Sequence, residues 1–257
     1  MEIVSGRSMM DQIAFGRLRF FHRDIPEVTR FSQLPWQEEE ARFRLAQRRA
    51  VLHLAAFHDQ VSRQTEPNTA SIFAIHAMLL EDDDFVNSIL TLIRQEKVTA
   101  EYAVQAVGQN FRAIFSAMDS SYMRARAADI RDISRRVMRL LMNCHPKDYL
   151  QQGPAILVSD EFFPSEVMDL NHRRLLGLVS RQGSVDSHTS MLLQAYHIPA
   201  MNQVDLSSRW DGHLALLDGF GNRLYLDPDR EAVDHLRLRY QAGGRPSQAE
   251  QRELQPV

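Results

Sequence analysis

Apolar residues recur at alternating spacings of three and four along the middle of the chain. The longest series follows Pro35, which suits the first turn of a helix, and three glutamates, which the positive end of a helix dipole favours. This spacing predicts a long helix with one apolar stripe, which ends before Glu66. The stripe consists of Phe43, Ala46, Ala50, Leu54, Phe57 and Val61.

Four more helices are expected before residue 145. The acidic run 81–84 interrupts or caps the second helix, and residues 119–121 offer N-cap oxygens to the fifth. Several helices with short breaks between them predict antiparallel neighbours and therefore a bundle. The four helices are predicted over residues 69–80, 85–95, 99–118 and 121–144.

The pattern changes after Pro146. Strands are predicted where short apolar runs occur, and helices are predicted between them. The run LALLDGFGNRLYLDP places two strand-like segments around a Gly-Phe-Gly-Asn turn, which is typical of a hairpin. Strands alternating with helices indicate an α/β unit with some parallel pairing. The predicted elements are strands at 155–160 and 175–181, helices at 165–173 and 188–196, and the hairpin at 214–228.

The first 30 residues contain short alternating runs that predict one or two strands. Because the helical stretch offers these strands no partner, we expect them to join the later sheet. The predicted fold class is therefore α/β plus all-α. A discontinuous α/β subdomain would cover 1–30 and 146–230, a helical bundle would be inserted over 31–145, and a helix with a polar tail would occupy 231–257.

Composition limits the partners, the metal sites and the cellular location that we expect for this chain. The chain has 257 residues, a net charge of −3 and a single cysteine, Cys144. This charge gives no general attraction to nucleic acid or to an anionic membrane, and no apolar run approaches the length of a membrane helix. One cysteine excludes an internal disulfide framework, and no ligand-spaced histidine pair is present, so no metal site is expected. A cytoplasmic protein fits best.

The segment GSVDSHTS contains the candidate for chemistry, His188. Gly183 and Ser184 keep the preceding loop small, Ser187 can cap a helix, and Thr189 and Ser190 add hydroxyls in its first turn. The start of a helix favours an anion, and neutral imidazole is a good nucleophile that can hold a phosphoryl group as a phosphoramidate. The alternative is an ordinary solvated loop histidine, and these residues alone do not decide between the two.

Segments spread over most of the chain resemble one family in the same order. The His188 segment resembles the G-G-x-T-S-H-[TA]-[SA] pattern of the phosphoenolpyruvate-utilising enzymes. The member of this family that the chain resembles most is Enzyme I of the bacterial sugar phosphotransferase system. Two helical segments, IFAIHAMLLEDDDF and YMRARAADIRDISRRVMRLL, resemble Enzyme I specifically. The segments IAFGRL and AILVSDEFFPSEVMDLN also match.

The resemblance implies a swivelling α/β phosphohistidine subdomain with an inserted helical subdomain, and a linker helix near the end. His188 would receive a phosphoryl group and pass it to a histidine of the small carrier HPr, which docks on the helical subdomain. Met78, Leu79, Leu80 and Met123 would form an apolar patch that adapts to HPr. The acidic residues 81–84 would meet a basic rim on HPr. The alternative is that these residues pack the bundle or form a solvated helix break. The candidate docking residues are His76, Met78, Leu79, Leu80, Glu81, Asp82, Asp83, Asp84, Met123 and Arg126.

Three positions depart from the family pattern. Ser184 replaces a glycine, Asp186 replaces a threonine, and Val167 replaces a threonine whose hydroxyl lies near the family's histidine. Asp186 would either orient the imidazole or repel an incoming phosphate. The chain is therefore interpreted as an active phosphotransferase, with a catalytically decayed HPr-binding regulatory module as the alternative.

The resemblance also implies a domain that this sequence does not match. Family members continue into a carboxy-terminal barrel that binds phosphoenolpyruvate and Mg²⁺, carries a catalytic cysteine and forms the dimer. Cys144 lies in the helical region and does not match that cysteine. We therefore expect this chain to be monomeric, to need no cofactor of its own, and to exchange phosphate with phosphorylated HPr without using phosphoenolpyruvate. Mg²⁺ and dimerisation are expected only for a full-length enzyme.

Overall fold

The computed structural model describes residues 1–23, 27–65, 67–144, 147–185 and 187–241. The chain forms two compact units, and each is described by itself below. The α/β unit comprises Met1–Arg23, Asp148–Phe162 and Asp169–Val257, of which 242–257 lie outside the described residues. The helical unit comprises Asp24–Lys147 and Phe163–Met168.

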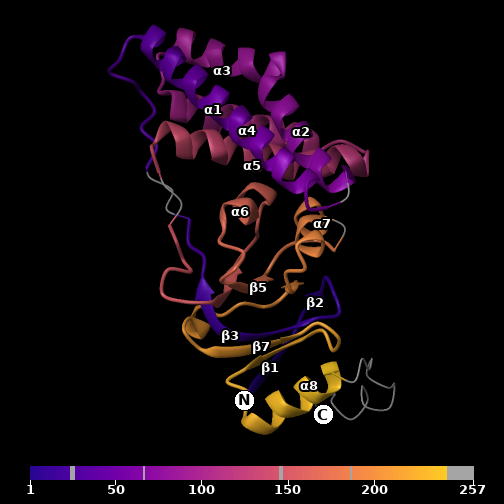
Figure 1. Cartoon of the computed structure of the whole chain (residues 1–257). Helices are drawn as coiled ribbons and strands as arrows, with labels where there is room; N and C mark the ends of the chain where they lie inside the picture. The colour runs from indigo at the N-terminus through magenta and orange to yellow at the C-terminus, as the bar shows by residue number, and fades with distance from the viewer. Residues whose placement is uncertain (24–26, 66, 145–146, 186, 242–257) are drawn as a thin grey trace. The chain divides into compact units, whose positions relative to one another are not determined.

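Five long helices make up most of the helical unit (Figure 1). All five were predicted, and their observed ends differ from the predicted ones by three residues at most. The largest difference is at the end of the fifth helix, which stops at Leu141 instead of Cys144. The helices are α1 (Trp36–Ser62), α2 (Pro67–Glu81), α3 (Asp83–Glu96), α4 (Ala100–Ser116) and α5 (Ser121–Leu141).

The predicted apolar stripe of α1 faces the core of the helical unit. Five of its six members are buried, and Phe57 is half-buried with its ring 5.5 Å from that of Phe73 in α2. Arg42 joins α1 to α4 by bonding Glu101 and Glu39, whose carboxylates accept from its guanidinium. Burial lowers the pKa of Arg42, but these bonds outweigh it and hold the pKa above its ordinary value. No helix among the described residues is both long and apolar enough to cross a bilayer.

A short helix, α6 (Pro164–Asp169), differs from its prediction in length and in position. It ends four residues earlier than predicted, and residues 163–168 belong to the helical unit instead of the α/β part. The physical reason for its position is a set of contacts with α5. Asp132 of α5 accepts from the Ser165 main-chain N–H at 3.0 Å, and the Phe163 ring lies under the guanidinium groups of Arg131 and Arg135, at 5.2 and 4.8 Å.

One eight-stranded mixed sheet forms the centre of the α/β unit, in the order β1-β8-β7-β3-β4-β5-β6-β2. The strands β3, β4, β5 and β6 are parallel neighbours, and the remaining pairings are antiparallel. The amino-terminal strands therefore join the later sheet, as predicted. The strands are β1 (Glu2–Ser5), β2 (Arg7–Ser8), β3 (Ile13–Phe20), β4 (Ala155–Ser159), β5 (Leu175–Ser180), β6 (Ala200–Asn202), β7 (Leu214–Asp218) and β8 (Arg223–Leu226).

The predicted helix after residue 188 is α7 (His188–Ala195), and a 3-10 turn, η1 (Ser208–Trp210), follows β6. A further helix, α8 (Arg230–Gln241), forms where a linker helix was predicted; its role as a linker stays a prediction. The core of the unit consists mainly of strand residues, among them the fully buried Leu18, Val179 and Met201, and it includes Trp210 of η1. Strand β6 was not predicted, because three residues are too few to show the alternation of apolar and polar residues that indicates a strand.

The predicted hairpin is confirmed as β7 and β8, joined by the turn 219–222. Asn222 adopts the left-handed conformation, with φ of 56°, which asparagine tolerates better than most residues. Gly219 donates its N–H to the Gln12 carbonyl at 2.8 Å and lies against the main chain of residues 10–12.

Gly219→Ala is therefore expected to destabilise the α/β unit by about 1–3 kcal/mol, because a Cβ would overlap main-chain atoms that cannot move without breaking this bond. Gly16→Ala in β3 is the matched control. Its Cβ would meet the Leu176 Cδ1, the end of a flexible and only half-buried side chain. Urea unfolding of both variants measures the difference, and an equal loss in the two would contradict this account.

Candidate functional site

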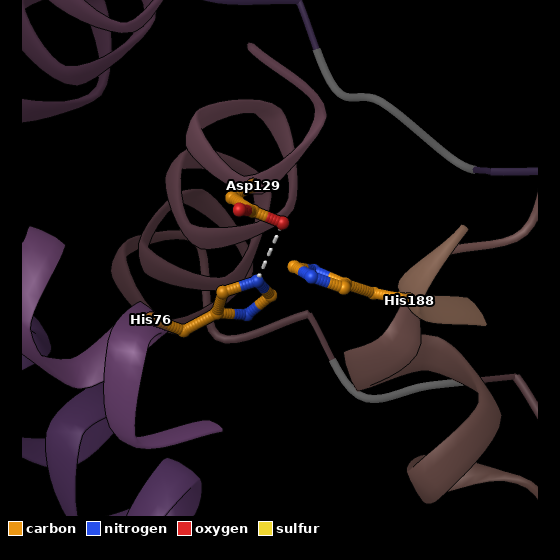
Figure 2. Close-up of side chains that lie close together, drawn as sticks. All are labelled: His76, Asp129 and His188. Carbon is orange, nitrogen blue, oxygen red and sulfur yellow. Dashed lines mark hydrogen bonds and ion pairs between the residues drawn. The ribbon is translucent and has the colours of Figure 1, made fainter. Parts of the chain in front are cut away.

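His188 is the first residue of α7, and the helix begins as predicted. Ser187 is the N-cap: its hydroxyl accepts from the Ser190 N–H at 3.2 Å, and its carbonyl accepts from the Met191 N–H at 3.0 Å. The imidazole is half-buried and projects from this end of the helix (Figure 2). The side chain therefore stands where the helix dipole is positive.

The loop before His188 is held by its own side chains. Ser190, which is fully buried, donates its hydroxyl proton to the Ser184 carbonyl at 2.5 Å, and the Ser187 N–H donates to the same carbonyl at 3.2 Å. Gly183 has φ of 134°, a conformation that strongly favours glycine. Gly183 and Ser184 are thus small residues, and hydrogen bonds hold the Ser184 carbonyl in place.

Two of the hydroxyls predicted to line a phosphate site have other roles. Thr189 donates to the Phe162 carbonyl at 2.9 Å, and Ser190 donates to Ser184 as described. Both hydroxyls hold the loop and the helix start in place, and their part in a phosphate site stays a prediction. Asp186, the acidic departure from the family pattern, lies outside the described residues.

Most of the candidate docking residues of the helical unit are either apolar or acidic. Met78 and Met123 are exposed, by 71% and 38%, and Leu79 is half-buried, whereas Leu80 is buried in the bundle. The acidic residues 81–84 are exposed, and Asp82 also caps α3 by accepting from the Phe85 N–H at 2.9 Å. The acidic run is therefore a helix break in part, and the exposed methionines stay candidates for docking.

His76 and Arg126 need a correction, because both are buried and bonded inside the protein. The His76 Nε2 lies 3.0 Å from an Asp129 oxygen, which is the dashed line in Figure 2, and its Nδ1 lies 3.6 Å from Asp132. Arg126 donates to the other Asp129 oxygen at 2.8 Å and to the hydroxyl of Tyr122. These residues join α2 to α5 and are not arranged to contact a partner directly.

The charge of Arg126 is maintained by these bonds. Burial lowers its pKa, but the hydrogen bonds to Tyr122 and Asp129 outweigh burial and hold the pKa above its ordinary value. Arg126 and Asp129 therefore form a buried ion pair, with side chains that are 8% and 3% exposed.

The buried network of His76, Arg126 and Asp129 continues along α5. The Ser165 N–H and hydroxyl donate to Asp132, and Arg136 contacts the Ser165 carbonyl at 3.3 Å and the His53 Nδ1 at 3.1 Å. Sequence reasoning missed this buried network, although a signal was present. The spacings between its α5 members are four, three, three and four, which places them on one helix face. They are Tyr122, Arg126, Asp129, Asp132 and Arg136.

Val167 is fully buried in α6 and offers no hydroxyl. Its neighbour Glu166 accepts from the Phe163 N–H at 3.1 Å and so closes the first turn of this short helix. Residues 164–167 therefore have a structural role in the helical unit, whatever else they do.

Two descriptions of one family match consecutive parts of the chain. "PEP-utilising enzyme, N-terminal" matches residues 5–126, and "PEP-utilising enzyme, mobile domain" matches residues 151–221. The chain belongs to the PEP-utilising enzymes. His188 and its loop lie in the part that matches the mobile domain, and the five helices lie mostly in the part that matches the N-terminal domain.

Curated relatives within the PEP-utilising enzymes are named phosphoenolpyruvate-protein phosphotransferase. The protein of Buchnera aphidicola subsp. Baizongia pistaciae is 25% identical over 241 residues, which are 91% of this chain and 42% of that protein. The protein of Bacillus sp. (strain S) is 29% identical over 212 residues, 80% of this chain and 37% of that protein. The chain thus spans about two fifths of the length of these relatives.

Two solved structures share the fold. A solution structure of Enzyme I (nEIt) superposes with a TM-score of 0.72 at 21% identity, and covers 93% of this chain and 99% of that one. The N-terminal domain of "Enzyme 1 - Nitrogen" superposes with a TM-score of 0.65 at 22% identity, with the same coverage. The resemblance to the amino-terminal part of Enzyme I, predicted from the sequence, is confirmed.

Proposed function

We propose that this chain is a phosphoryl-carrier domain of an Enzyme I-type phosphotransferase, with His188 as the residue that carries the group. The observation that carries the proposal is the place of His188, at the start of a helix that Ser187 caps. Phosphohistidine adds about −2 of charge by analogy with other phosphorylated side chains, and a helix start favours such a charge.

The transfer needs no water and no second protein nucleophile. A nitrogen of the neutral His188 imidazole attacks the phosphorus of a phosphohistidine on the partner, and a new P–N bond forms as the partner's P–N bond breaks. The electron pair of the broken bond returns to the partner's imidazole, which takes up a proton, while the phosphorylated His188 ring releases the proton of its other nitrogen. The reverse step delivers the group to the carrier. In a longer protein, phosphoenolpyruvate would load His188 through a separate Mg²⁺-dependent domain.

The partner is an HPr-type carrier that docks on the helical unit. Met78, Leu79 and Met123 offer flexible apolar contacts, and the exposed acids at 81–84 offer a negative rim. A carrier with a basic rim around an apolar patch fits this chemistry. A cytoplasmic setting, where such carriers work, follows from this assignment.

A second candidate is a carrier-binding module that no longer transfers phosphate, and Val167 favours it because the position offers no hydroxyl. Two hydrogen bonds next to His188 favour the active domain, since Ser187 still caps α7 and Ser190 still holds Ser184. Transfer of phosphate, as opposed to binding alone, separates the two candidates.

The test uses an HPr carrier that has been phosphorylated with ³²P by a full-length relative and then separated from it. On mixing, the chain is expected to take up an acid-labile, base-stable label. Met78→Asp is expected to raise the carrier concentration at half-maximal rate about tenfold or more, because a charge in a docking patch is poorly tolerated.

Leu52→Asp is the matched control, since Leu52 is 67% exposed on α1 and lies outside the candidate patch. It is expected to leave the half-maximal concentration unchanged. Binding of the carrier without any label on the wild-type chain would replace the active domain by the binding module. Equal effects of the two substitutions would remove the docking patch from the proposal.

A further inference from the structure

Asn202, the last residue of β6, is a fully buried amide without a hydrogen-bond partner. Its side chain is 0% exposed, and neither its Nδ2 nor its Oδ1 has a partner among the described residues. A buried polar group that lacks a partner destabilises a protein, and an apolar residue of the same shape would be neutral or stabilising in its place. The folded, unphosphorylated protein therefore gives no reason for an amide here.

The position of this amide points to the phosphohistidine loop. A Cβ on Gly183 would lie 3.4 Å from the Asn202 Nδ2, and 3.8 Å from the Ser180 hydroxyl. Asn202 and Ser180 come from the ends of the parallel neighbours β6 and β5, directly beneath Gly183. Both groups belong to the α/β unit, as does the loop.

The other buried polar groups beneath the loop are already used. The Ser180 hydroxyl donates to the Gln182 carbonyl at 2.8 Å, and the Ser190 hydroxyl donates to the Ser184 carbonyl at 2.5 Å. These bonds fix the main chain on each side of Gly183. Asn202 lies next to Gly183 itself and, unlike these hydroxyls, its amide has no partner among the described residues.

We propose that Asn202 is a positioning residue, whose carboxamide bonds the main chain at Gly183 when His188 carries a phosphoryl group. This inference rests on the proposed function. The added negative charge attracts main-chain N–H groups of the loop, and the peptide that follows Gly183 then turns its N–H towards the phosphoryl group and its carbonyl towards Asn202. Glycine at 183 makes such a turn inexpensive. Asn202 would touch the loop and not the reacting atoms.

The test compares Asn202→Leu and Asn202→Asp with the wild type, because the three side chains have nearly the same shape. The readouts are the equilibrium constant for transfer from the phosphorylated HPr carrier and the hydrolysis rate of the isolated phosphorylated chain. Asn202→Leu is expected to lower the equilibrium constant about three- to tenfold and to speed hydrolysis, with stability of the unphosphorylated protein unchanged or higher. Asn202→Asp is expected to lower the constant further, because its charge repels the phosphoryl group.

A measurement on the wild type does not depend on how the variants fold. In ¹H–¹⁵N spectra the side-chain amide of Asn202 is expected to shift and to exchange more slowly with water after phosphorylation, whereas that of Asn171 is not. An unchanged Asn202 amide, or an Asn202→Leu protein with wild-type equilibrium and hydrolysis, would overturn the role of Asn202 and leave the proposed function intact. Absence of any label on the wild type would instead overturn the proposed function, and this inference with it.

Discussion

His188→Ala is expected to take up no phosphoryl group from a phosphorylated carrier under conditions in which the wild type is fully labelled. The substitution removes the nucleophile and leaves the helix start intact, because the cap bonds of α7 are made by Ser187 and main-chain groups. Alanine is also well tolerated in a first helical turn. The loss should therefore be complete, with unchanged circular dichroism and unchanged carrier binding, and labelling after gel filtration measures it.

His197→Asn is the control for this experiment. His197 follows the same helix, is exposed, and has φ of 54°, a conformation that asparagine accepts. The control is expected to be labelled like the wild type. If His188→Ala kept the label, or if His197→Asn lost it, the assignment of the carrier histidine would be wrong.

Asp129→Ala is expected to have the largest effect on stability, a loss of about 3–5 kcal/mol. The substitution leaves the Arg126 guanidinium, which is 6% exposed, without its carboxylate partner, and it removes the acceptor for the His76 Nε2. Since this network joins α2 to α5, the helical unit should unfold at a much lower urea concentration. Far-ultraviolet circular dichroism follows this transition, because the unit is mostly helix.

Asp59→Ala is the matched control on α1. Asp59 pairs with His58 at 3.4 Å, but its side chain is 69% exposed, so the pair is expected to contribute less than about 1 kcal/mol. Asp129→Asn should fall between the two, because it keeps an acceptor for His76 and loses the charge. A loss at Asp129→Ala no greater than that at Asp59→Ala would mean that the buried network does not hold the helices together.

The sequence predicted the elements that are determined by residues close together in the chain. The α1 stripe, the caps at Ser120 and Ser187, and the Gly-Phe-Gly-Asn hairpin each depend on residues close together in the chain, and each is observed. The pairing of the amino-terminal strands was also predictable, because a strand without a local partner must find a distant one.

Features that depend on distant contacts were not predictable in the same way. The place of α6 in the helical unit depends on Asp132, which is far away in the sequence. Arg126 and His76 were assigned to the docking surface from the family resemblance. The sequence pattern could not correct this, because a charged residue at helical spacing has the same pattern whether it faces solvent or a buried partner. Asn202 carried no sequence signal, because only the folded sheet brings it beneath Gly183.

The central claim is tested most directly by locating the phosphoryl group on the unmodified protein. The chain is incubated with a phosphorylated HPr carrier, digested at alkaline pH, where phosphohistidine is stable, and sequenced by tandem mass spectrometry. The account predicts one phosphoryl group, on the peptide that contains His188 and on that residue. A phosphoryl group on any other histidine, or none on a chain that binds the carrier, would contradict it.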